Sequence, residues 1–88
     1  MLPLVHLKCG GFVSIQASAM HFCTPRRDHG PYTHWEMGLV RDCTREAVAL
    51  LTTFDGDRAA YVPTDTVKAF IQACGGPSRP VDHPIFGE

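Results

Sequence analysis

One amphipathic helical segment near the C-terminus constrains the fold of this chain more than any other feature. Four apolar residues recur at the spacing i, i+3, i+4 and i+7, on one helical face: Val67, Phe70, Ile71 and Cys74. Thr64 is placed to cap the N-terminus of this helix, and Asp65 adds an acid to its first turn. Gly75-Gly76 supplies a C-terminal cap, and Pro77 prevents continuation. A helix with one apolar stripe must pack that stripe on another element.

The first seventeen residues predict a β-hairpin. Residues 4–9 and 12–17 flank Gly10-Gly11, which is typical of a tight turn. A two-residue turn would set apolar residues of one strand opposite polar residues of the other, whereas a three-residue loop, Cys9-Gly10-Gly11, builds one apolar face. We therefore expect the three-residue loop, with these apolar pairs: Leu7 opposite Val13, and Val5 opposite Ile15.

The middle of the chain predicts further strands. Residues 24–31 contain two prolines and a glycine and are expected to form a loop, and residues 32–40 alternate as a half-buried strand. Residues 47–54 fit either a short helix or a strand, and we expect a second hairpin in which they turn at Asp55-Gly56 into a strand at 59–62. The predicted fold class is α+β: an antiparallel sheet of four to five strands with one C-terminal helix packed on it.

The length of 88 residues has room for one domain. We assign residues 1–76 to a single α+β domain and residues 77–88 to a mobile C-terminal tail. The apolar residues of that tail need a surface, either on the domain itself or on a partner: Val81, Ile85 and Phe86. A domain this small buries a limited fraction of its surface, so a homodimer is compatible with its size.

Charge and hydropathy exclude several classes of function. Eight Lys+Arg against nine Asp+Glu give a formal charge of −1, without the basic excess of a nucleic-acid binder or the acidic excess of a DNA mimic. Direct nucleic-acid binding is therefore not expected. No apolar stretch approaches the roughly 18 residues of a membrane span. The first residues lack the pattern of a secretory signal, so we expect a cytoplasmic protein with reduced cysteines.

The histidines and cysteines suggest metal or nucleophilic chemistry only weakly. His21, Cys23, His29 and His34 form the densest set of potential zinc ligands, but their spacing is not that of known zinc sites. Cys23 with His21 or His34, oriented by Glu36, is the only nucleophile and base set that the sequence offers. Phosphate-binding and dinucleotide-binding motifs are absent. We therefore expect no catalytic activity, no metal and no cofactor.

A small basic and aromatic patch is the best candidate for a binding surface. Arg26 and Arg27 precede Tyr32 and Trp35 within ten positions, and arginine and aromatic side chains are enriched among hot spots of protein interfaces. A solvated loop in front of a core tryptophan is an equally good interpretation. The residues that we predict to bind a partner are Arg26, Arg27, His29, Tyr32 and Arg58.

A resemblance adds to this interpretation. The motifs that carry it are His21-Phe22-Cys23-Thr24-Pro25-Arg26, then Gly30-Pro31-Tyr32-Thr33 and Glu36-x-Gly38, and later Tyr61-Val62-Pro63 before a helix that ends at Gly75-Gly76. This pattern resembles short uncharacterised proteins of bacteriophages and prophages, in which it is roughly His-Tyr-Cys-Ser-Pro-Arg, a Gly-x-Tyr turn and a Val-Glu-Val-Gly strand. The resemblance covers about residues 14–76 and departs from the pattern at Phe22, Thr24 and Trp35.

The resemblance implies a viral or mobile-element origin and no particular chemistry. Small phage proteins without cofactor motifs commonly bind and block a host machine, and anti-CRISPR proteins are the best-known class. We therefore expect a protein that binds and sterically inhibits a host defence complex, a protein or protein–RNA assembly such as a CRISPR–Cas effector. The alternatives are a small regulatory nucleic-acid-binding module and a homo-oligomeric phage accessory protein without a host target.

Overall fold

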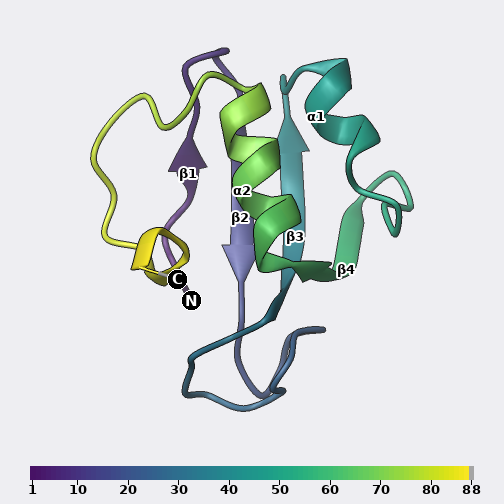
Figure 1. Cartoon of the computed structure of the whole chain (residues 1–88), viewed down its shortest axis with the longest axis vertical. Helices are drawn as coiled ribbons and strands as arrows, with labels where there is room; N and C mark the ends of the chain where they lie inside the picture. The colour runs from purple at the N-terminus through teal and green to yellow at the C-terminus, as the bar shows by residue number, and fades with distance from the viewer. Residues whose placement is uncertain (88) are drawn as a thin grey trace.

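The computed structural model describes residues 1–87, and Glu88 lies outside the described part. The elements in chain order are β1 (Val5–His6), β2 (Phe12–Gln16), β3 (His34–Arg41), α1 (Arg45–Ala49), β4 (Arg58–Pro63), α2 (Thr64–Ala73) and the 3-10 turn η1 (Pro84–Gly87). The four strands form one antiparallel sheet in the order β1-β2-β3-β4, and α2 packs on one of its faces (Figure 1). The predicted α+β class is confirmed, and α1 adds a short helix between β3 and β4.

The apolar stripe of α2 fills the core against the inward side chains of the sheet. Trp35 and Phe70 are the largest fully buried side chains. The predicted helix cap, Thr64, is instead the first residue of α2, and Pro63 occupies the cap position without a side-chain hydrogen bond. The Thr64 hydroxyl is engaged elsewhere, because it accepts a hydrogen bond from Trp35 Nε1 at 2.9 Å. The C-terminal cap follows the prediction, since the N–H of Gly76 donates to the carbonyl of Ile71 at 2.9 Å.

The first hairpin has the predicted faces and a different register. Val5 lies opposite Val13, so the loop comprises residues 8–10, one position earlier than expected. Gly10 is the loop residue with positive φ, at 95°. Gly11 lies against the end of β3, where a Cβ would come within 2.4 Å of the carbonyl oxygen of Arg41. The hydrophobic pattern cannot separate the two registers, because a shift of this size leaves the same residues on the apolar face.

The second predicted hairpin is wrong in one strand. Residues 51–54 form no strand, and only an isolated bridge between Phe54 and Ala59 remains of the predicted pairing, because β4 pairs with β3. Helix α1 lies in the intervening segment, capped by the Thr44 hydroxyl, which accepts from the N–H of Ala47 at 3.2 Å. Ala47 and Leu51 are buried there, so packing outweighs the strand preference of the Thr-Thr-Phe run. The turn at Asp55-Gly56 is present, and the Asp55 carboxylate accepts hydrogen bonds from the N–H groups of Asp57 and Arg58, both at 3.0 Å.

Residues 77–87, the described part of the segment assigned to the C-terminal tail, pack on the domain. The N–H of Ser78 donates to the carbonyl of His6 at 2.8 Å, and His83 and Ile85 are buried. Continuing the β1–β2 register would place Pro3 opposite Ile15, and proline has no N–H to donate. The His83 Nε2 atom fills that role, at 2.8 Å from the carbonyl oxygen of Ile15. The segment therefore completes an edge that β1 is too short to cover.

This docking depends on neutral His83. Its Nε2–H donates to Ile15, and its Nδ1 accepts from the N–H of Ile85 at 3.0 Å. Burial lowers the pKa of His83 below its ordinary value of 6.5, although the bond to Ile15 opposes the shift. The unfolded chain therefore takes up a proton at a higher pH than the folded chain. Neutral His83 therefore contributes its full stabilisation of the folded state above about pH 6.5, and this contribution is lost as the pH falls through the pKa of the folded chain.

We predict that His83→Gln removes this pH dependence. Glutamine can still donate to Ile15 but gives Ile85 no equivalent acceptor, so the variant should be less stable by about 1–2 kcal/mol near neutral pH. Urea unfolding of both proteins at about pH 7.5 and pH 5.5 measures the difference. The difference in the free energy of unfolding between the two proteins should be smaller at the lower pH. A gap that is constant or widens would contradict the neutral imidazole, and the other four histidines are common to both proteins.

A second prediction concerns the contact of the hairpin with β3. Gly11→Ala forces a methyl group against main-chain oxygen and should cost about 1–3 kcal/mol. Gly38 in β3 is the matched control, because a Cβ there meets no atom within 4 Å and its φ is not positive. Gly38→Ala should change the stability by less than about 1 kcal/mol. Thermal unfolding of the two variants tests this, and equal losses would contradict the close approach.

Candidate functional site

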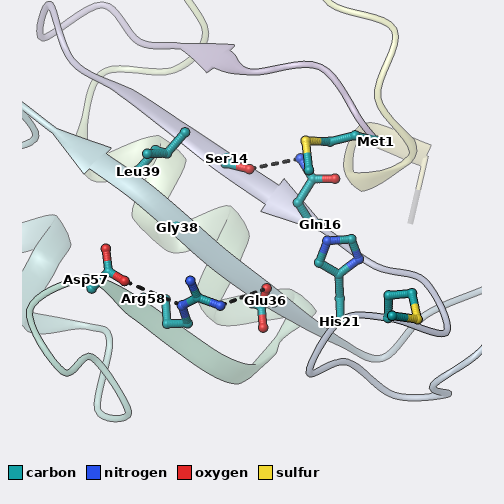
Figure 2. Close-up of a pocket in the computed structure, with 10 residues that line it drawn as sticks. Met1, Ser14, Gln16, His21, Glu36, Gly38, Leu39, Asp57 and Arg58 are labelled. Carbon is teal, nitrogen blue, oxygen red and sulfur yellow. Dashed lines mark hydrogen bonds and ion pairs between the residues drawn. The ribbon is translucent and has the colours of Figure 1, made fainter.

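The face of the sheet opposite α2 carries a depression in the molecule's surface. Side chains alternate along the strands, so the partners of the buried residues point to this face. The helices lie behind the sheet in Figure 2, and the residues in front line a hollow of about 330 Å³. These residues come from the N-terminal segment, β2, β3, the loop before β3, β4 and the turn before β4: Met1, Ser14, Gln16, Met20, His21, Glu36, Gly38, Leu39, Asp57 and Arg58. We call this surface the open face.

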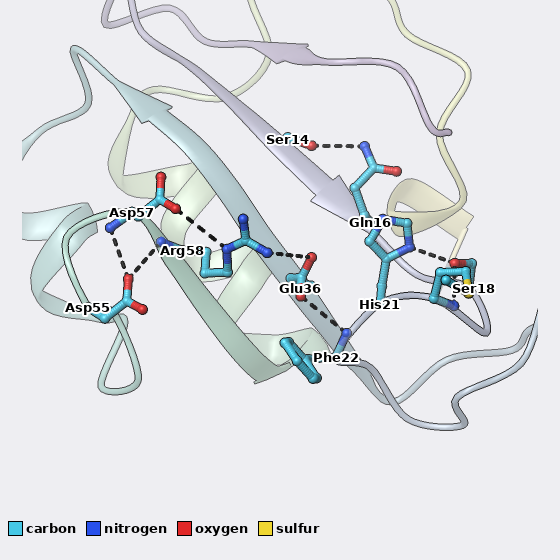
Figure 3. Close-up of polar contacts among 10 residues, drawn as sticks. Ser14, Gln16, Ser18, His21, Phe22, Glu36, Asp55, Asp57 and Arg58 are labelled. Atoms are coloured by element: carbon cyan, nitrogen blue, oxygen red, sulfur yellow. Dashed lines mark hydrogen bonds and ion pairs between the residues drawn. The ribbon is translucent and has the colours of Figure 1, made fainter.

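Gln16 anchors the first residues of the chain beside the open face. Its Nε2 donates to Ser14 Oγ at 2.8 Å and to the carbonyl of Leu2 at 2.9 Å, and its Oε1 accepts from the N–H of Leu2 at 2.8 Å. Figure 3 shows the bond to Ser14. The side-chain amide of Gln16 therefore satisfies both the N–H and the C=O of Leu2, as the backbone of a neighbouring strand would. Its role is to fix one wall of the depression.

Glu36 holds the opposite wall. One of its carboxylate oxygens accepts from the N–H of Phe22 at 3.2 Å, and the other lies 4.0 Å from Arg58 NH1 (Figure 3). Arg58 also pairs with Asp57, with 3.6 Å between Nε and the carboxylate. The charges of this wall are therefore of both signs and mutually paired. The Arg58–Asp57 pair is solvent-exposed and adds little to stability. Paired charges of both signs make this wall suited to a partner with complementary polar groups.

Two β-bulges, one in β3 and one in β4, place large side chains at the surface. In β3, Leu39 has a φ of 47° beside the register shift with β2, and in β4, Tyr61 has a φ of 53° beside the register shift with β3. Positive φ is costly for bulky residues, and bulges redirect side chains away from the ladder. Leu39 is 49% exposed and Tyr61 is 46% exposed. The backbone thus holds two large apolar side chains in water at a cost in strain.

Tyr61 belongs to an exposed aromatic cluster. Its N–H donates to the carbonyl of Phe22 at 3.0 Å, and the two rings are 6.0 Å apart between centroids. The guanidinium of Arg26 lies 5.1 Å from the centre of the Phe22 ring, within the range of a cation–π contact. We call Phe22, Arg26 and Tyr61 the aromatic ridge. It presents the side-chain types that dominate protein interfaces.

The structure separates the five predicted partner-binding residues. Arg26 lies in the aromatic ridge and Arg58 on the open face. Tyr32 is only 7% exposed, and its hydroxyl donates to the carbonyl of Arg27 at 2.9 Å. Burial is the main cause that raises the pKa of Tyr32. Arg27 in turn donates from Nε to the carbonyl of His29 at 3.2 Å, so these three residues organise their own loop.

The nucleophile set suggested by the sequence is not assembled. The buried Cys23 thiol donates to the carbonyls of Ser18 and Pro25 at 3.2 and 3.4 Å. His21 pairs through Nδ1 with the Ser18 hydroxyl at 2.6 Å, and His34 pairs with that of Thr33 at 2.8 Å. Among residues 1–87, no group of three histidine, cysteine or acidic residues has the geometry to hold a metal ion.

Sequence reasoning missed Phe22, Leu39 and Tyr61 as surface residues. One signal was available for β4: its inward residues Ala59 and Val62 are separated by two positions, which breaks the alternation and indicates a bulge. The β3 alternation of Trp35, Met37 and Leu39 looked regular, so nothing in it indicated that Leu39 leaves the core.

Comparison with known proteins gives no assignment. No protein-family model, no curated protein and no solved structure matches this chain. Within residues 1–87, no helix has both the length and the apolar character needed to cross a membrane.

The strain at Tyr61 can be measured directly. Glycine adopts positive φ at no steric cost and alanine does not, so Tyr61→Gly should be more stable than Tyr61→Ala by about 1 kcal/mol. Both variants lose the same ring contacts with Phe22. Ala60→Gly is the control at a neighbouring position of the bulge whose φ is not positive, and it should lower the stability by a similar amount. Chemical denaturation ranks the variants, and an alanine variant as stable as the glycine variant would contradict the strained geometry.

Proposed function

We propose that this chain is a phage or mobile-element protein that binds a host defence complex and blocks it sterically, as anti-CRISPR proteins do. The proposed target is a CRISPR–Cas effector, and the proposed site of action is the cytoplasm of the bacterial host. The observation that supports binding most is the backbone strain that keeps Leu39 exposed on the open face and Tyr61 exposed in the aromatic ridge. Strained exposed apolar residues destabilise an isolated protein, and contact with a partner would offset that cost.

The charge of the surface favours a protein partner over a nucleic acid. Arg58 is paired with Glu36 and Asp57, and Arg26 lies over the Phe22 ring. A surface that tracks phosphates would instead need several unpaired cations. Aromatic rings and an arginine at one place are the composition of a protein hot spot. The aromatic ridge is therefore the proposed energetic centre, with the open face as its surroundings.

The dimensions of the molecule are compatible with steric blocking. It measures 31 × 28 × 19 Å and has an accessible surface of 5108 Å². A standard protein interface buries about 800 Å² on each partner, roughly one-sixth of that surface. One broad side of the sheet can supply this area while the rest of the body stands in the path of a nucleic acid or a recruited nuclease.

The proposal predicts a stoichiometric inhibitor with a localised hot spot. A tagged chain, used as bait in nuclease-treated lysate of a bacterium with an active CRISPR–Cas system, should retain the effector. Titration into the purified effector should then abolish target cleavage near equimolar amounts. Inhibition at amounts far below the effector, or binding that disappears with nuclease treatment, would contradict it. The first result would indicate an enzyme and the second a nucleic-acid-binding module.

Variants locate the surface. Tyr61→Ala and Arg26→Ala should each weaken inhibition by about 10-fold or more, since hot-spot truncations commonly cost 1–2 kcal/mol or more. Arg79→Ala removes an exposed arginine from the C-terminal segment and is the matched control. It should change the inhibition by less than about 2-fold. Circular dichroism of each variant checks the fold. Equal loss in all three would contradict a hot spot at the aromatic ridge.

A further inference from the structure

Three of the four cysteines meet at one end of the sheet, although they are far apart in the sequence. Cys9 lies in the β1–β2 loop, Cys43 follows β3, and Cys74 ends α2. The β1–β2 loop, the start of α1 and the C-terminal end of α2 all lie at the upper end of the molecule in Figure 1. Besides burial, Cys74 and Cys9 are among the causes that raise the pKa of Cys43, and Cys9 is among those that raise the pKa of Cys74, as expected of thiols that lie near one another. All four cysteines of the chain are free thiols.

The main chain aligns Cys9 with Cys74. The N–H of Cys9 donates to the carbonyl of Cys74 at 3.0 Å, and the N–H of Lys8 donates to that of Gly76 at 2.9 Å. Such a bond holds the two Cα atoms roughly 5–6.5 Å apart, the range in which disulfides occur. The loop and the helix end are therefore already at the spacing that a disulfide needs.

The three thiols differ in their access to solvent. Cys9 is exposed, Cys43 is half-buried and Cys74 is 1% exposed. Burial raises the pKa of the Cys74 thiol and raises that of Cys43 to about 12, and the neighbouring thiols add to both shifts. Cys43 also points at main-chain oxygen, 3.4 Å from the carbonyl of Arg41. An oxidant in water therefore meets Cys9 first, and Cys74 is the buried cysteine to which the main chain of Cys9 is hydrogen-bonded.

We propose that Cys9 and Cys74 form a reversible disulfide when the protein meets a peroxide. In the first step the Cys9 sulfur attacks hydrogen peroxide, the O–O bond breaks, and Cys9 becomes a sulfenic acid with release of one water. In the second step the Cys74 sulfur attacks the Cys9 sulfur, the S–O bond breaks, and a second water leaves as the S–S bond forms. Each peroxide is reduced to two waters, and the two thiols together lose two hydrogen atoms.

The bond links two parts of the fold that are distant in sequence. It ties the β1–β2 loop to the C-terminal end of α2 and closes a loop that contains most of the chain. Cross-links across long loops restrict the unfolded chain most, so the oxidised form should unfold at a higher temperature. Because the backbone bonds already exist, the link needs no rearrangement of the sheet. The aromatic ridge and the open face take no part, so this inference stands apart from the proposed function.

The test is peroxide oxidation of the purified full chain, followed by thiol blocking and mapping of the unreduced peptides. Trypsin together with chymotrypsin separates Cys9 from Cys23, which trypsin alone leaves on one peptide. The expected product is a peptide pair joined through Cys9 and Cys74, lighter by two hydrogen atoms and absent after reduction. The oxidised protein should melt higher by about 5 °C or more, and reduction should reverse the shift.

Three variants make the assignment falsifiable. Cys9→Ser changes an exposed side chain and should abolish both the linked peptide and the shift in melting temperature. Cys74→Ala should do the same, whereas Cys43→Ala should retain both. A Cys43–Cys74 link, a link between two chains, or sulfinic acid at Cys9 without any link would overturn the proposal. Loss of the link in Cys43→Ala would overturn it as well.

Discussion

The buried indole of Trp35 is the contact on which the rest of the fold depends. Its Nε1 donates to the Thr64 hydroxyl and so joins β3 to the first residue of α2. Its ring packs against Tyr32 from the preceding loop, with 5.3 Å between centroids, and against His83 from the C-terminal segment, at 5.9 Å. A buried indole N–H without an acceptor would cost about 1–3 kcal/mol, so residue 64 must supply a hydrogen-bond acceptor to Trp35. One side chain thus sets the places of the loop, the helix and the tail.

The open face is rigid because the same contacts hold it from behind. Residues of the sheet that point inward are packed against α2, so their outward neighbours have little freedom to move. Gln16 and Glu36 then fix the two segments that wall the depression through main-chain hydrogen bonds. A preformed surface loses little conformational entropy when it binds, which is consistent with the proposed binding role.

The sequence is sufficient to predict the elements and faces of this fold but not how they are joined. Periodicity identified α2 and the buried side of β3 as far as Met37, because apolar spacing reports burial directly, but it wrongly placed Leu39 on that side. The register of the first hairpin depends on how closely Gly11 approaches the end of β3, a contact between distant segments. Residues 51–54 have strand propensity, which the burial of Leu51 outweighs. The docking of the C-terminal segment could not be predicted for a similar reason. His83 binds the carbonyl of Ile15, which is unpaired only because β1 is too short to cover this edge of the folded sheet.

The candidate site was the hardest part to predict because its defining feature is a conflict between local and global preferences. A leucine and a tyrosine in the left-handed region cost roughly 1–3 kcal/mol each, against a stability of about 4–13 kcal/mol expected for a chain of this length. Glycine at either position would remove that cost, and the side chains now there make few compensating contacts, since both are about half exposed. Within each bulged strand, the paired residues before and after the bulge hold it in place. Folding alone therefore gives no reason for these two residues, whereas a surface that must present them to a partner does.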